Sequence, residues 1–187
     1  MGQRIDIRSG FYFYLAALIF LLSLPWLCAA LTAAILHEIG HILAAHILCL
    51  QIHSICLDMG GAQIKTSPAS DLQTLLTALA GPVIGILLFF SFRAFPRLAF
   101  CGLIQSAFNL IPIMPFDGGR VLLSLCNLLF GASRGVKVYK YVSAILLMII
   151  GLLLYSLLNS PWVIIMLFAL LSLGIRHEKK ILLANRL

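Results

Sequence analysis

Long apolar runs dominate the chain, and its polar residues are gathered mostly at the breaks between those runs. Residues 11–50 are almost continuously apolar, about twice the roughly 20 residues that one helix needs to cross a hydrocarbon core. The Pro25-Trp26 pair interrupts this run, and an aromatic residue at such a place is typical of a membrane interface. The pattern therefore predicts two spans, over about residues 9–26 and 29–49, joined by a tight turn.

The segment that follows, from Gln51 to Ser70, is more mixed in character. Two short apolar stretches flank a Gly60-Gly61 pair, and glycine pairs are favoured in two-residue hairpin turns. The segment is therefore predicted to form a small β-hairpin, with a re-entrant loop as the alternative.

The second half of the chain contains one irregular span. A regular span is expected over about residues 71–92, with Asp71 as its N-cap, but the apolar residues 98–130 are interrupted by Pro112 and Pro115. Proline cannot continue a regular helix, so this fourth span is predicted to be broken. Within a bilayer, broken backbone is tolerated only where protein covers it or where it lines a wet cavity.

Two further spans are expected over residues 138–158 and 161–175. The predicted fold class is therefore an all-α polytopic membrane protein with about six transmembrane helices, a hairpin or re-entrant loop after the second and a broken fourth helix. We expect one transmembrane domain over residues 1–187, without a PDZ or CBS domain.

Composition supports a membrane protein and excludes a soluble one. Hydrophobic residues make up 62% of the 187 residues and charged residues 10%, whereas soluble domains have about 45–50% and about 25%. The net charge of +7 could indicate nucleic-acid binding, but that needs basic residues clustered on one face. Here they lie at the ends of the apolar runs, which indicates membrane anchoring and no nucleic-acid partner.

The basic residues also predict an orientation. Six spans place both termini on one side, and basic residues prefer the cytoplasmic side. With a cytoplasmic N-terminus only Arg93 and Arg97 face outside, and Arg120 lies within the fourth span. The basic residues placed inside are Arg4, Arg8, Lys65, Arg134, Lys137, Lys140, Arg176, Lys179, Lys180 and Arg186.

The second predicted span carries an H-E-x-x-H motif, His37-Glu38-Ile39-Gly40-His41. Residues i and i+4 share one face of a helix, so both imidazoles can bind the same zinc ion. Glu38 is placed to act as a general base toward an attacking water rather than as a ligand. The alternative is an interhelical hydrogen-bond cluster, but ionisable groups within a span are costly and are usually functional.

A catalytic zinc site needs a third protein ligand. His46 is about 140° around the helix from His41 and is expected to point elsewhere, since a helix turns about 100° per residue. His53, in the hairpin region, could approach the site. Other side chains of ligand type are expected in solvent, beside the hairpin or in the basic tail: Asp58, Asp71, His177 and Glu178.

Asp117 differs from these candidates because it lies on the broken span at membrane depth. Prolines before it expose backbone, and Gly118 and Gly119 after it permit close approach. A carboxylate is a competent zinc ligand. Asp117 could also be the N-cap of the following half-helix, alone or together with ligation.

The motif, taken with residues 109–119, resembles the site-2 protease family of intramembrane zinc metalloproteases. The resemblance covers about residues 10–130 and includes the asparagine, proline, aspartate and glycine of that family's second motif, here between Asn109 and Gly119. Ala80-Gly81-Pro82 is similar to a weaker family motif. That motif continues with an asparagine, which this chain lacks over Val83 to Gly85.

The resemblance implies a role for five residues. It implies that His37, His41 and Asp117 bind Zn²⁺ and that Glu38 is the general base. Asn109 would be a polar group near the substrate or the oxyanion.

In layout the chain is similar to the stage IV sporulation protein FB branch of the family. The resemblance implies a metalloendopeptidase of the bacterial cytoplasmic membrane, and the basic residues predict that both termini are cytoplasmic. Its substrate would be a membrane-associated or transmembrane protein such as a pro-sigma or anti-sigma factor, and regulatory membrane partners could accompany it. The alternatives are a membrane metal transporter and an inactive protease-like scaffold.

Overall fold

The computed structural model describes residues 4–58, 61–160, 162, 165 and 169. By its internal contacts the chain divides into two compact units, Met1–Asn109 and Leu110–Leu187. The boundary falls inside the predicted fourth span, just before Pro112. The expectation of one domain over residues 1–187 stays a prediction.

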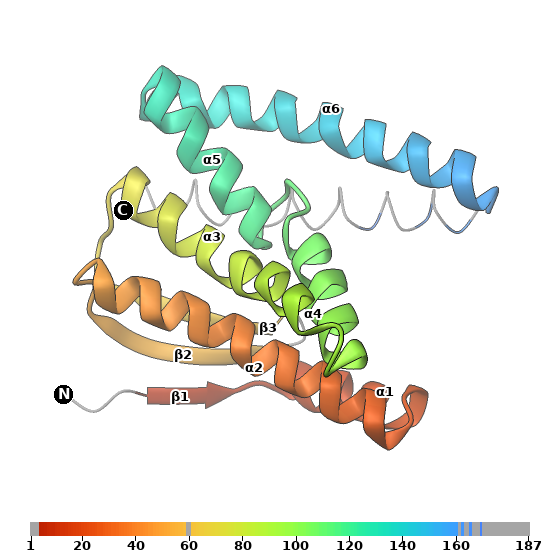
Figure 1. Ribbon diagram of the computed structural model, residues 1–187. Helices are drawn as coiled ribbons and strands as arrows, with labels where there is room; N and C mark the ends of the chain where they lie inside the picture. The colour runs from red at the N-terminus through yellow and green to blue at the C-terminus, as the bar shows by residue number, and fades with distance from the viewer. Residues whose placement is uncertain (1–3, 59–60, 161, 163–164, 166–168, 170–187) are drawn as a thin grey trace. The chain divides into compact units, whose positions relative to one another are not determined.

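The first unit begins with two helices, α1 (Ser9–Leu21) and α2 (Leu24–Ile47) (Figure 1). The break between them lies before Pro25 and not at the predicted Pro25-Trp26 pair. Pro25 occupies the first turn of α2, where its missing N–H removes no hydrogen bond because the first N–H groups of a helix have no acceptor within it. At this position proline begins the helix rather than ending one.

A three-stranded sheet lies beside these helices. The strands β2 (Ile52–Asp58) and β3 (Gly61–Thr66) pair antiparallel where the sequence predicted two strands. The additional strand β1 (Arg4–Ile7) pairs with β2 in parallel, which gives the order β1-β2-β3. Because β1 precedes α1 and β2 follows α2, this pairing brings the chain back to the side from which it started.

The sequence did not reveal β1, and it assigned the wrong cap to the next helix. Four residues are too few for a clear alternation of apolar and polar positions. At α3 (Asp71–Leu87) the N-cap is Ser70 and not Asp71. Ser70 Oγ accepts a hydrogen bond from the backbone N of Gln73 at 3.2 Å, and Gln73 Oε1 accepts one from the backbone N of Ser70 at 3.0 Å. This is a capping box, which needs the glutamine three residues after the cap.

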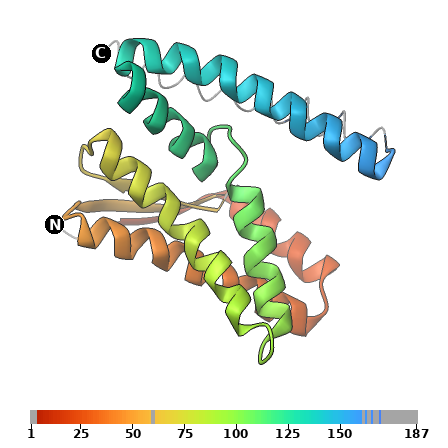
Figure 2. The ribbon, with the colours of Figure 1, turned by 45° about the horizontal axis from the view of Figure 1, so that its top comes forward.

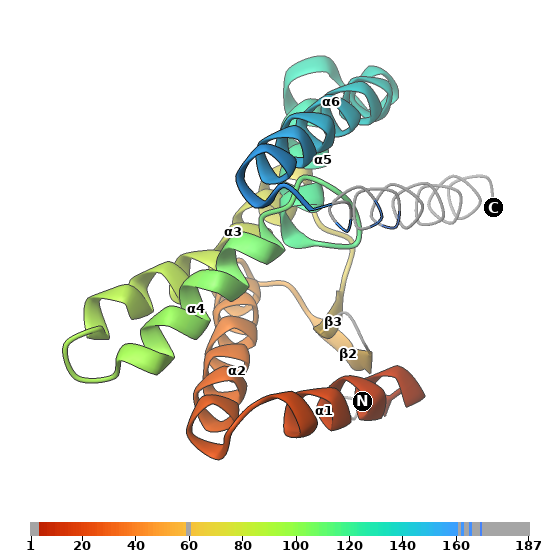
Figure 3. The same ribbon diagram turned by 90° about the vertical axis from the view of Figure 1, so that its right-hand side faces the viewer.

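Small residues let α3 pack closely on both neighbours in the first unit. A 3-10 turn (Leu88–Ser91) and a short loop join α3 to α4 (Pro96–Asn109) (Figure 3), and α2, α3 and α4 all contact one another (Figure 2). A Cβ on Gly40 would come within 2.8 Å of the Ala80 carbonyl oxygen. Such small-residue contacts are the usual way in which membrane helices bring their backbones together.

The second unit consists of a non-helical linker, residues 110–116, and two helices, α5 (Asp117–Phe130) and α6 (Ala132–Leu158). Gly131, with φ +77°, forms the corner between these helices, a backbone conformation that other residues rarely adopt. The linker is the predicted break in the fourth span. Its Ile113 is buried with Leu147 of α6.

Three helices of the described part are long and apolar enough to cross a membrane: α2, α3 with its 3-10 extension, and α6. The chain is therefore a mostly helical membrane protein. The helices α1, α4 and α5 have 13, 14 and 14 residues, about 20 Å at 1.5 Å per residue, less than the roughly 30 Å core. The predicted sixth span, 161–175, falls almost wholly outside the described residues, so the count of six spans stays a prediction.

Candidate metal centre

The two histidines of the H-E-x-x-H motif lie side by side on α2. His37 is 2% exposed and His41 7% exposed, and their Nε2 atoms are 3.2 Å apart. Two imidazole nitrogens that bind one zinc ion tetrahedrally at about 2.0–2.1 Å are separated by roughly 3.3 Å. The pair therefore has the spacing that a shared metal ion requires.

A backbone contact from α3 fixes the ring of His41. Its Nδ1 lies 2.8 Å from the Thr77 carbonyl oxygen. A carbonyl oxygen only accepts hydrogen bonds, so Nδ1 is the nitrogen that donates. The lone pair of the neutral ring is then on Nε2, which faces His37. Metal-binding histidines are commonly oriented by such a second contact.

Gly81 gives both imidazoles their space. A Cβ at this position would lie 2.3 Å from His41 Nε2 and 2.8 Å from His37 Nε2. The sequence drew attention to Ala80-Gly81-Pro82 because of a family resemblance, and the geometry supplies the physical reason. The α3 backbone forms the wall against which the two rings pack.

We predict that Gly81→Ala weakens zinc binding. The added methyl group would displace the two Nε2 atoms, because contacts below 3.0 Å do not persist. Outer-shell changes typically cost about 10–100-fold in metal affinity, and a loss of at least that size is expected in a chelator-competition titration. The matched control is Val83→Ala on the same helix, where the side chain is 46% exposed. Equal affinity of Gly81→Ala and wild type would contradict this assignment.

Asn109, the last residue of α4, lies beside the histidine pair. Its Nδ2 is 3.4 Å from His37 Nε2, and its side chain is half-buried. A neutral amide here adds polarity without charge, which fits the predicted place near a substrate carbonyl. Its catalytic role stays a prediction.

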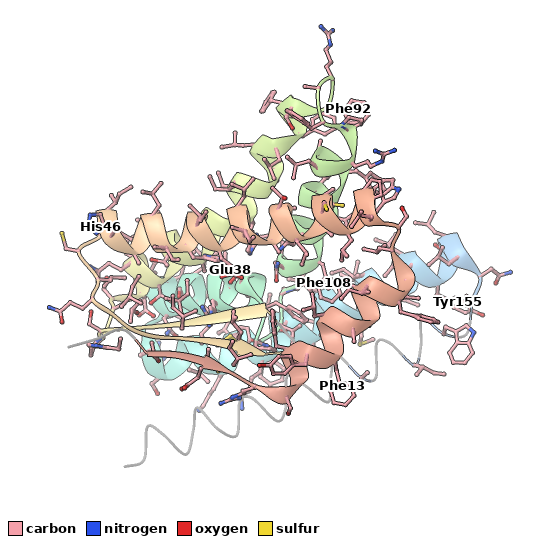
Figure 4. The ribbon with its side chains drawn as sticks, turned by 90° about the horizontal axis from the view of Figure 1, so that it is seen from below. Phe13, Glu38, His46, Phe92, Phe108 and Tyr155 are labelled. Atoms are coloured by element: carbon pink, nitrogen blue, oxygen red, sulfur yellow. The ribbon has the colours of Figure 1, made fainter. Side chains whose placement is uncertain are left out.

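Glu38 lies next to His37, midway along α2, and is half-buried (Figure 4). His46 is near the C-terminal end of the same helix, well separated from Glu38 (Figure 4), and is exposed. The histidine pair and Glu38 are thus held in the packed middle of α2. The role of Glu38 as a base stays a prediction.

In the second unit, Asp117 is the first residue of α5 and is 8% exposed. The predicted alternative, an N-cap, is wrong: the cap position is Phe116, and no side chain caps this helix. Helix capping therefore does not explain why the Asp117 carboxylate is buried. Zinc binding by Asp117 stays a prediction.

Two glycines shape the backbone next to Asp117. A Cβ on Gly118 would lie 2.2 Å from the Leu110 carbonyl oxygen, and one on Gly119 would lie 2.3 Å from the Ile113 carbonyl carbon. The linker therefore crosses directly over the first turn of α5. The sequence indicated only that Gly118 and Gly119 permit a close approach, and the structure shows that the approaching group is the linker backbone.

Among the side chains that the structure describes, no other candidate ligand joins the histidine pair and Asp117 in a cluster. His53 on β2 is exposed, as is His46, and Asp71 lies in the first turn of α3. The side chain of Asp58 and both His177 and Glu178 fall outside the described residues. The sequence did not point to Thr77 as part of the site. Thr77 contacts His41 through its backbone carbonyl, and such a contact leaves no signal in the sequence.

Comparisons with known proteins find similarity to peptidases and zinc metalloproteases, which is consistent with a metal-binding histidine pair. The model of the family described as Peptidase family M50 matches residues 91–153. A zinc metalloprotease of Methanocaldococcus jannaschii is 27% identical over 203 residues, covering 97% of this chain and 59% of that protein. A relative from Synechocystis is 29% identical over 170 residues, covering 75% of this chain and 45% of its own length. The chain thus spans about half the length of these curated relatives.

A solved structure shows the same fold. The site-2 protease from Methanocaldococcus jannaschii matches with a TM-score of 0.64 and 23% identity, over 94% of this chain and 91% of that one. The stretch that matches the M50 family contains Asn109 and Asp117 but not the histidine pair. It therefore supports a relation to this family independently of the H-E-x-x-H motif.

Proposed function

We propose that this protein is a zinc metalloprotease of the M50 type that cleaves peptide bonds in a membrane. The observation that carries the proposal is the buried pair His37 and His41, whose Nε2 atoms are 3.2 Å apart. The M50 match and the zinc metalloprotease relative support it. Glu38 within the motif distinguishes a hydrolase from a protein that only binds metal.

The proposed ligands are His37, His41 and Asp117. Two imidazoles and one carboxylate form a donor set suited to zinc, with one position left for water or substrate. All three side chains are buried, and a buried carboxylate is stabilised by pairing or by metal coordination. Thr77 would hold His41 in the tautomer that binds through Nε2.

The protein's own groups would then carry the proton transfers. When bound, zinc would supply Lewis acidity that polarises the scissile carbonyl and makes an attacking water more acidic. Glu38 would accept the proton of that water and return it to the leaving amine. Asn109 would donate a hydrogen bond from Nδ2 to the developing oxyanion.

We further propose where the protein acts and on what. The substrate would be a membrane-associated or transmembrane protein, since the histidine pair lies in the middle of a membrane-spanning helix. The predicted arrangement of spans resembles that of the stage IV sporulation protein FB branch. This resemblance favours regulated cleavage of a pro-sigma or anti-sigma factor in the bacterial cytoplasmic membrane. If the chain has the six predicted spans, the distribution of basic residues supports an orientation with both termini in the cytoplasm.

Metal removal tests the proposal directly. We expect the purified protein in lipid vesicles to cleave a dye-labelled transmembrane peptide placed in the same vesicles, and to lose this activity on treatment with 1,10-phenanthroline. Adding back zinc should restore cleavage, because the ligands stay in place without it. Cleavage that persists after the metal content has been shown to be negligible would contradict a metalloprotease.

A further inference from the structure

The buried face of α6 follows a four-residue spacing. Its buried residues are Gly135, Tyr139, Ser143, Leu147 and Gly151, and residues four apart lie nearly above one another on a helix. Two of these, Tyr139 at 3% and Ser143 at 6% exposure, carry hydroxyl groups. Hydroxyl groups that are buried on an apolar helix are expected to have hydrogen-bond partners.

Both hydroxyls bond to the backbone of the linker that precedes Asp117. The Met114 N–H donates to Tyr139 Oη at 3.0 Å, and Ser143 Oγ donates to the Pro112 carbonyl oxygen. One turn further along α6, Leu147 packs in the same buried cluster as Ile113. Three consecutive turns of α6 thus hold residues 112–114.

The other side of the linker lies on the first turn of α5. Gly118 and Gly119 bring that turn against the carbonyls of Leu110 and Ile113, at distances that leave no room for a Cβ. Residues 110–114 are therefore layered between α6 and the turn that begins with Asp117. The position of Asp117 in this unit is set by how the linker is held.

The chemistry of the linker explains why α6 supplies hydroxyls. A non-helical segment in an apolar environment leaves backbone N–H and C=O groups without their usual partners. Tyr139 accepts a hydrogen bond from one backbone N–H of the linker, and Ser143 donates one to a backbone carbonyl. Together they satisfy one donor and one acceptor of the linker. Apolar side chains would bury the same surface but could not fix the linker in one orientation.

We propose that Tyr139 and Ser143 are positioning residues for Asp117, which hold the linker so that the carboxylate is presented in one orientation for zinc. The inference rests on the proposed function, since it assigns Asp117 as a ligand. Neither residue is one of the proposed zinc ligands. Their two hydrogen bonds to the linker would raise the affinity of the site for zinc.

The test uses the full-length protein with Tyr139→Phe, Ser143→Ala and the double variant. Each substitution removes one hydroxyl and leaves the packing volume nearly unchanged. Zinc affinity is measured by chelator competition, and backbone hydrogen exchange of residues 110–116 is measured on metal-free protein. Tyr141→Phe, at a side chain 73% exposed on the same helix, and Ser156→Ala, at an exposed serine, are the matched controls.

We expect each single variant to bind zinc about 10-fold more weakly, the lower end of the range for outer-shell partners. The double variant should lose more, and exchange in the linker should become faster in all three. Ser143→Thr keeps the hydroxyl and should retain the wild-type affinity. Both controls should match the wild type in affinity and exchange.

Two results would overturn the inference, and they can be told apart. Faster linker exchange with unchanged zinc affinity would show that the hydrogen bonds serve stability and do not position Asp117. A wild-type protein that binds no zinc would instead contradict the proposed function, and with it the role of Tyr139 and Ser143 in positioning Asp117 as a ligand.

Discussion

Replacing Glu38 with glutamine is expected to abolish proteolysis while leaving zinc bound. Glutamine has nearly the same shape as glutamate but cannot accept the proton of the attacking water. Loss of a general base typically slows a reaction about 10²–10⁴-fold, so turnover in vesicles should fall by at least two orders of magnitude. Zinc content, measured on the same preparation, should equal that of wild type.

The matched control for this substitution is Asp71→Asn. Asp71 is an acidic residue in the first turn of α3 and does not cap that helix, and the change removes one charge just as Glu38→Gln does. It should keep its turnover. If Glu38→Gln cleaves as fast as the wild type, Glu38 is not the base, and the motif would then serve metal binding alone.

The second large effect is expected from His37→Ala and His41→Ala, each of which removes one imidazole from the buried pair. If an apparent binding free energy of about 10 kcal/mol is shared among three ligands, losing one removes about 3 kcal/mol, more than a hundredfold in affinity. Chelator competition measures this loss. His46→Ala removes an exposed histidine from the same helix and should bind zinc as wild type does; a loss there equal to that of His37→Ala would contradict the assignment.

The part of the site on α2 could be predicted because its information is local. The i, i+4 spacing of His37 and His41 places both rings on one face of any helix, and the structure brings their Nε2 atoms to 3.2 Å. The direction of His46 follows from the same geometry. No tertiary packing was needed for either inference.

Other features depend on contacts that leave no mark in the sequence. The Thr77 carbonyl orients His41 through the backbone, which any residue at that position would provide. Strand β1 depends on its pairing with β2, about 50 residues later in the chain. The role of Gly81 against both imidazoles required the packing of α3 on α2, although a family resemblance pointed to this residue.

Helix ends were predicted least well, because several residue types compete to begin a helix. Asp71 and Asp117 are both good N-cap residues, yet each is the first residue inside its helix. For α3 the capping box with Gln73 favours Ser70 over Asp71. For α5 the layered linker sets the start of the helix, so Asp117 is buried without serving as a cap.

The most direct test of the three-ligand site is the metal content of the detergent-purified protein, with wild type measured beside His37→Ala and Asp117→Ala. The account predicts about one zinc per chain in the wild type, with the content reduced in both variants while their helical content is unchanged. A well-folded wild type without zinc would contradict the metalloprotease assignment. Wild-type zinc content in Asp117→Ala would remove Asp117 from the ligands.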